Sequence, residues 1–141
     1  MRRIDDSLSV SPQIGPADVT EIARAGFTTI INNRPDGEET DQPEGDAIRT
    51  AAETLGLDYA EIPVTSAGFS HAQVNAMRAA LDGAKGPVFA YCRSGTRSTN
   101  LWALAEAKAG GDPDTIVAKA RAAGYDLTAI RPMLDALAGA R

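Results

Sequence analysis

One short segment, CRSGTRS at residues 92–98, contains the residue types that nucleophilic chemistry needs. Cys92 is the only cysteine of the chain, and Arg97 follows it after four intervening residues. The stretch VFAY before the cysteine is typical of a buried strand, and the stretch after it has helical spacing. A lone cysteine is more often a small core residue, but this pattern at a strand-to-helix junction favours a catalytic nucleophile.

The loop after the cysteine is suited to binding an anion. Its backbone N–H groups can turn toward one point, and Gly95 supplies the conformational freedom that such a tight curl needs. The positive end of the following helix faces the same point. Cys92 as a thiolate and Arg97 as a forked cation are therefore predicted to be catalytic. The predicted anion-binding residues are Arg93, Ser94, Gly95, Thr96, Ser98 and, from an earlier loop, Arg34.

Three of these side chains have two interpretations each. Ser98 is expected either to cap the helix or to donate a hydrogen bond to the sulfur. Arg93 is expected either beside the anion or in solvent. Arg34 lies in the block NNRPDGEE, which follows an apolar strand and so reaches the same end of the sheet as the cysteine. It either contacts a bound anion or pairs with Asp36 or Glu38 in a solvated loop.

The elements that must position this loop alternate between short apolar stretches and helical patterns. Strands are expected at residues 8–10, 27–32, 58–64 and 88–92, and helices at 15–26, 46–55, 70–81, 98–111, 112–124 and 127–140. Such alternation predicts an α/β fold with a mostly parallel central sheet flanked by helices, in a single domain of residues 1–141.

Composition excludes several classes of function. The net charge of −5 argues against a nucleic-acid partner, and no stretch is long and apolar enough to span a membrane. One cysteine and one histidine give no ordinary metal site, and no cofactor is expected. A single thiol and the lack of a secretory leader are typical of a cytoplasmic protein, so that location is expected.

The segment CRSGTRS resembles the active loop of single-domain rhodaneses. The chain as a whole resembles the phosphatase-like domain of bacterial beta-lactamase-hydrolase-like proteins, through LSVSPQIGPADV, GFTTIINNRPDGEE, IPV and CRSGTRSTNLWALA. That resemblance implies a tyrosine-phosphatase-like sandwich and an activity of either phosphatase or sulfur transferase. In longer relatives the domain precedes a persulfide dioxygenase, which is therefore an expected partner.

Features around the loop favour sulfur transfer. Tyrosine phosphatases have five residues between cysteine and arginine, one more than here, and typically a histidine where this chain has Tyr91. The segment EIPVTSAGFSHAQVN has no aspartate to serve as a general acid, which leaves Glu61 or His71 as substitutes. Thr65 and Ser66 of this segment are expected to line the pocket.

The leading prediction is therefore a rhodanese-like, cysteine-dependent sulfurtransferase. Its thiolate would take sulfane sulfur from thiosulfate or a small persulfide, and a second, external thiol would accept it, because the chain has no resolving cysteine. The alternative is a phosphatase that hydrolyses aryl or tyrosine-type phosphoesters through a cysteinyl-phosphate on Cys92. A further alternative is an anion or persulfide sensor without turnover.

Overall fold

The apolar stretches form one sheet with strand order β1-β2-β5-β3-β4 in the computed structural model, which describes residues 1–139. The strands are β1 (Arg2–Arg3), β2 (Leu8–Ser11), β3 (Thr29–Asn32), β4 (Asp58–Glu61) and β5 (Val88–Tyr91). The α-helices are α1 (Val19–Arg24), α2 (Gly45–Thr54), α3 (His71–Gly83), α4 (Thr96–Lys108), α5 (Pro113–Ala122) and α6 (Arg131–Gly139). Two 3-10 helices, η1 (Pro16–Asp18) and η2 (Thr128–Ile130), precede α1 and α6.

The strand before the cysteine is the central strand of the sheet. β5 pairs in parallel with both β2 and β3, and Val88 lies opposite Leu8 on one side and Thr29 on the other. All four β5 residues are buried, as expected for a strand covered on both faces. Because the three strands run in register, the loops that follow them leave the sheet at the same edge.

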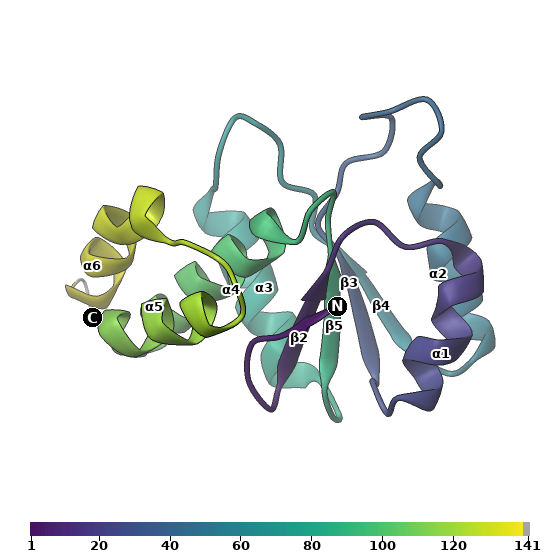
Figure 1. Ribbon diagram of the computed structural model, residues 1–141, viewed down its shortest axis with the longest axis horizontal. Coiled ribbons are helices and arrows are strands. Elements are labelled where there is room, and N and C mark those ends of the chain that lie inside the picture. Colours follow the sequence, from purple (N-terminus) through teal and green to yellow (C-terminus); the bar gives the residue numbers. More distant parts are fainter. Residues whose placement is uncertain (140–141) are drawn as a thin grey trace.

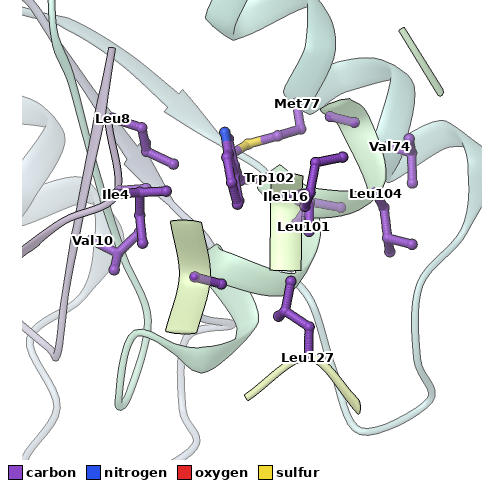
Figure 2. Close-up of a cluster of buried hydrophobic side chains, with 14 of the residues drawn as sticks. Ile4, Leu8, Val10, Val74, Met77, Leu101, Trp102, Leu104, Ile116 and Leu127 are labelled. Atoms are coloured by element: carbon purple, nitrogen blue, oxygen red, sulfur yellow. The ribbon is translucent and has the colours of Figure 1, made fainter. Parts of the chain in front are cut away.

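Helices cover both faces of the sheet (Figure 1). α1 and α2 lie on one face, and α3 to α6 lie on the other. The larger core cluster belongs to the second face and includes Trp102 and Leu101 of α4 (Figure 2). Trp102 therefore packs in the core, as expected for a large apolar residue on this helix. α4 is buried along most of its length, so the helix that begins beside the cysteine is fixed by the core.

Two strands, β1 and β4, differ from the expectation. β1 was not expected, because two exposed residues give no periodic pattern; it pairs antiparallel with β2. The expected strand at 58–64 ends at Glu61. Pro63 has no N–H to continue the ladder, although the N–H groups of Ile62 and Val64 still donate to the carbonyls of Asn32 and Asn33.

The predicted α/β class with a mostly parallel sheet is confirmed. Two predicted helix starts are also confirmed. Ser70 and Gln73 form the expected capping box of α3, and Asp112 and Pro113 are the N-cap and first residue of α5. The expected last helix and the expected domain reach residues 140 and 141, which lie outside the described residues. Within residues 1–139, no helix is both long enough and apolar enough to cross a membrane.

Candidate active site

The cysteine lies where three loops leave the same edge of the sheet. Cys92 follows β5 directly, and its backbone N–H donates to the carbonyl of Ser11 at the end of β2, 3.3 Å away. On the other side, the N–H of Asn33 donates to the carbonyl of Tyr91 at 2.8 Å. These bonds hold the start of the cysteine loop between the loops that follow β2 and β3.

The loop curls so that a backbone donor faces the sulfur. The N–H of Gly95 lies 3.1 Å from Sγ of Cys92, and the cysteine is buried and free. Gly95 has φ +90°, a left-handed conformation that only glycine adopts without strain, and it is the N-cap of α4. The hydroxyl of Thr99 donates back to the Gly95 carbonyl at 2.9 Å. A sulfur that accepts an N–H at the start of a helix is placed to carry negative charge.

The other residues of the loop have different surroundings. The hydroxyl of Ser94 donates to Oγ1 of Thr96 at 3.0 Å on the exposed side of the loop. Ser98 is not the helix cap, because α4 begins two residues earlier than it. Its hydroxyl is buried and has no hydrogen-bond partner among residues 1–139, so the expected bond to sulfur is not formed. The Arg93 side chain is 70% exposed and pairs with Glu39, as its solvent interpretation expected.

Arg97 is held by a carboxylate that comes from the loop after β3. Its Nη1 lies 2.7 Å from Oε2 of Glu38, and its Nη2 lies 2.8 Å from Oε1. Nη1 also donates to the carbonyl of Val64 at 2.7 Å. A guanidinium has five N–H groups, so these contacts leave one on Nε and one on Nη2, which form a parallel fork. This remaining fork can bind an oxyanion.

The electrostatics tie this ion pair to the cysteine. The hydrogen bond from Arg97, together with Arg34, lowers the pKa of Glu38 to about 2, so its carboxyl is ionised at neutral pH. Glu38 also raises the pKa of Arg97, and the charge on Cys92 adds to that rise. The guanidinium is therefore close enough to interact with a thiolate.

Arg34 contacts Glu38, the same carboxylate that holds Arg97. Its side chain is only 4% exposed, with Nε 2.8 Å from Glu38, Nη2 3.1 Å from Glu39 and Nη1 3.1 Å from Oε1 of Gln13. Arg34 thus pairs with Glu38, as one interpretation expected, but in a buried network and not in a solvated loop. Asp36, the other expected partner, accepts from the N–H of Gly45 instead.

Four other side chains weighed from the sequence lie on the surface, on the edge strand or in the core. His71 is exposed at the first position of α3. Glu61 accepts a hydrogen bond from the hydroxyl of Tyr59 at the edge strand β4. Tyr91 is buried in the smaller core cluster, which lies on the α1–α2 face of the sheet. Thr65 is exposed in the segment that offers the neighbouring Val64 carbonyl to Arg97.

Sequence reasoning missed two contributors to this site. Glu38 was expected only as a partner for Arg34, although it forms an ion pair with Arg97, which is 59 positions away in the sequence. Tyr125 was not considered at all, yet its hydroxyl donates to the carbonyl of Ser94 in the cysteine loop at 3.2 Å. The only signal for Glu38 was its place in the block NNRPDGEE, which the sequence put at the same end of the sheet as Cys92. Tyr125 had none, because it lies in a connection between two packing helices.

Comparison with known proteins identifies the relatives of the chain. The family described as "Beta-lactamase hydrolase-like protein, phosphatase-like domain" matches residues 1–109. The Beta-lactamase hydrolase-like protein of Agrobacterium fabrum is 41% identical over 105 residues, which cover 74% of this chain and 24% of that protein. A protein of the same name from Xylella fastidiosa is 38% identical over 125 residues, covering 88% of this chain and 29% of that protein. The chain thus matches only 24% and 29% of the length of these two relatives.

Solved structures extend the comparison to the fold. A candidate phosphatase from Neisseria meningitidis Z2491 is 39% identical, has a TM-score of 0.83 and matches over 96% of each chain. TpbA of P. aeruginosa, solved in complex with phosphotyrosine, has a TM-score of 0.66 at 17% identity. That match covers 98% of this chain and 87% of TpbA, and at such identity it is a likeness of fold. The predicted tyrosine-phosphatase-like fold is confirmed.

Proposed function

We propose that Cys92 is the nucleophile of a phosphatase reaction in this chain, which belongs to the family of phosphatase-like domains of beta-lactamase hydrolase-like proteins. The substrate class is a phosphate monoester of a phenol, including phosphotyrosine. One observation carries the proposal: Glu38 fixes Arg97 within hydrogen-bonding and electrostatic reach of Cys92, whose sulfur also accepts the N–H of Gly95.

The reaction has two steps at the sulfur. Sγ of Cys92 attacks phosphorus, so that an S–P bond forms and the P–O bond to the aryl group breaks. Water then attacks the same phosphorus, breaks the S–P bond, restores the thiolate and releases inorganic phosphate. In both steps, Arg97 and the loop amides stabilise charge on the phosphoryl oxygens.

The positions of the three candidate acids support an aryl leaving group. Glu38 remains a carboxylate at neutral pH, because its pKa is about 2, and so cannot supply a proton. Within residues 1–139, His71 is exposed at the start of α3 and Glu61 accepts a hydrogen bond from Tyr59 at the edge strand, so neither is held at the cysteine loop. A phenolate leaves without full protonation more readily than an alkoxide does. This supports aryl esters over phosphoserine or other alkyl esters.

The same comparisons favour phosphate over the sulfur donor that the sequence alone suggested. The match with the candidate phosphatase from N. meningitidis extends over nearly the whole chain. TpbA, which shares the fold, was solved with phosphotyrosine. Sulfur transfer stays a second candidate on one observation, the loop of only four residues between Cys92 and Arg97. A shorter loop offers fewer amides to the three oxygens of a phosphoryl group.

Two measurements on the purified chain separate these reactions. Phosphate release from an aryl phosphate over many turnovers, abolished in Cys92→Ser, supports the phosphatase and excludes a sensor without turnover. Intact mass after incubation with thiosulfate or glutathione persulfide tests the other candidate. One sulfur retained on the wild type, absent from Cys92→Ser and discharged by a thiol, together with no phosphate release, overturns the phosphatase proposal.

A further inference from the structure

One peptide group of the cysteine loop is held at both ends. Between Ser94 and Gly95, the N–H donates to Sγ of Cys92 at 3.1 Å, and the carbonyl accepts from the hydroxyl of Tyr125 at 3.2 Å. In a planar trans peptide the N–H and the C=O point in opposite directions. A hydroxyl that holds the carbonyl on the outer side therefore keeps the N–H turned toward the sulfur.

We propose that Tyr125 is a positioning residue, which locks the Ser94–Gly95 peptide in the orientation that presents its N–H to the nucleophile. The inference rests on the proposed role of Cys92 as the nucleophile. It holds for attack on phosphorus and on sulfur alike, since both need a thiolate.

The Ser94–Gly95 peptide has more conformational freedom than a peptide between two non-glycine residues, so its orientation has to be fixed by a contact. Gly95 carries the positive φ of +90°, and glycine adopts conformations on both sides of φ = 0 with little penalty. Rotation of the peptide would turn the Ser94 carbonyl oxygen toward the sulfur. A partial negative charge would then face the thiolate and any bound anion, and the hydrogen bond to Sγ would be lost.

Tyr125 is itself held rigidly. It follows Gly124, which lies just after the C-cap of α5 with φ +97°. The N–H groups of Gly124 and Tyr125 donate to the carbonyls of Arg121 and Ala120, both at 2.9 Å. The half-buried ring packs against the larger core cluster. A Cβ added to Gly95 would collide with the Tyr125 hydroxyl, so the ring end lies directly against the loop.

The protonation of Tyr125 suits a donor. Burial, and then the charge on Cys92, raise the pKa of its phenol above the ordinary value, so the hydroxyl keeps its proton at neutral pH. The contribution from Cys92 also places the two groups within electrostatic reach. Tyr125 lies beyond residue 109, where the family match ends, so this support comes from outside the matched region.

The test compares Tyr125→Phe with Tyr59→Phe. Both variants remove one half-buried hydroxyl that is hydrogen-bonded, but that of Tyr59 donates to Glu61 at the edge strand and accepts from Asn32, with no bond to the cysteine loop within residues 1–139. The readout is the ultraviolet thiolate absorbance of the single cysteine, measured against pH with the matching Cys92→Ser protein as blank. We expect the ratio of thiolate to thiol near neutral pH to fall about 3- to 10-fold in Tyr125→Phe, the size of one hydrogen bond. In Tyr59→Phe it should not change.

Thermal melting and a second variant separate positioning from packing. Tyr125→Leu also removes the ring, so it should melt lower yet show the same loss of thiolate as Tyr125→Phe. A thiolate profile in Tyr125→Phe equal to that of the wild type would overturn the inference. A wild type that forms the thiolate but releases no phosphate would instead contradict the proposed function and leave the role of Tyr125 standing.

Discussion

Glu38 and Arg97 form a two-pronged ion pair across 59 positions of sequence, with Nη–Oε distances of 2.7 and 2.8 Å. The pair joins the loop after β3 to the first turn of α4, so it fixes the arginine relative to the cysteine. This carboxylate binds the end of the guanidinium through Nη1 and Nη2. If Arg97 binds the substrate as proposed, the anion would meet the Nε and Nη2 side of the guanidinium, and Glu38 would stay in place.

Glu38→Gln should lower kcat/KM for an aryl phosphate. The amide keeps the shape of the side chain but loses the charge and one acceptor, so Arg97 is less firmly oriented. Hydrogen bonds to charged groups set the expected loss at about 10- to 100-fold. The control is Glu39→Gln, which removes a carboxylate that contacts Arg34 and Arg93 but not Arg97 and should change the rate far less. A more active Glu38→Gln would mean that the carboxylate competes with substrate.

The same carboxylate should contribute to stability in acid. The pKa of Glu38 is about 2 in the folded chain and 4.5 in its ordinary state, so the folded state favours the ionised form. Its contribution is then fully present above about pH 4.5 and is lost as pH falls through about 2. Urea unfolding across that window should show a smaller fall in stability for Glu38→Gln than for the wild type. Parallel pH profiles for the two proteins would contradict the prediction.

Sequence was sufficient where a local signal decides the structure. The change from the apolar stretch at residues 88–91 to helical spacing placed Cys92 at the carboxyl end of a strand, and the glycine at position 95 marked the tight curl. The capping box at Ser70 is a pattern of four consecutive residues, and it appears as expected. These features depend on neighbours in the chain.

Sequence was insufficient where the partner lies far away. The carboxylate that holds Arg97 and the phenol that holds the Ser94 carbonyl come from loops that only the packed fold brings together. Arg34 was expected either to contact an anion or to pair with Asp36 or Glu38 in a solvated loop. It does pair with Glu38, but it is buried because acceptors from two loops surround it. The preference for phosphate over sulfur also rests on relatives, because loop length and the lack of an aspartate in residues 61–75 favoured sulfur transfer.

Arg34→Lys should destabilise the fold although the charge is kept. The guanidinium of Arg34 donates to three side chains while only 4% exposed, and one ammonium cannot reach all three in the same geometry. Loss of one or two buried hydrogen bonds should cost about 1–3 kcal/mol in the free energy of unfolding. Arg24→Lys, at an exposed pair with Glu21, should leave the urea midpoint unchanged. Equal midpoints for both variants would show that the network at Arg34 adds no stability.

Gly95→Ala should impair both stability and nucleophilicity. A non-glycine residue at φ +90° costs about 1–2 kcal/mol, and the added methyl group would also collide with the hydroxyl of Tyr125. Gly26→Ala is the matched control, since Gly26 has φ +97° but open space around its missing Cβ. Urea unfolding should show a loss in both variants and the larger one at Gly95. Only Gly95→Ala should also lower the rate of phosphate release, because the collision displaces the peptide that donates to Cys92. Equal stability losses and unchanged turnover would mean that the loop accommodates the methyl group. The contact between Gly95 and Tyr125 would then not affect the reaction.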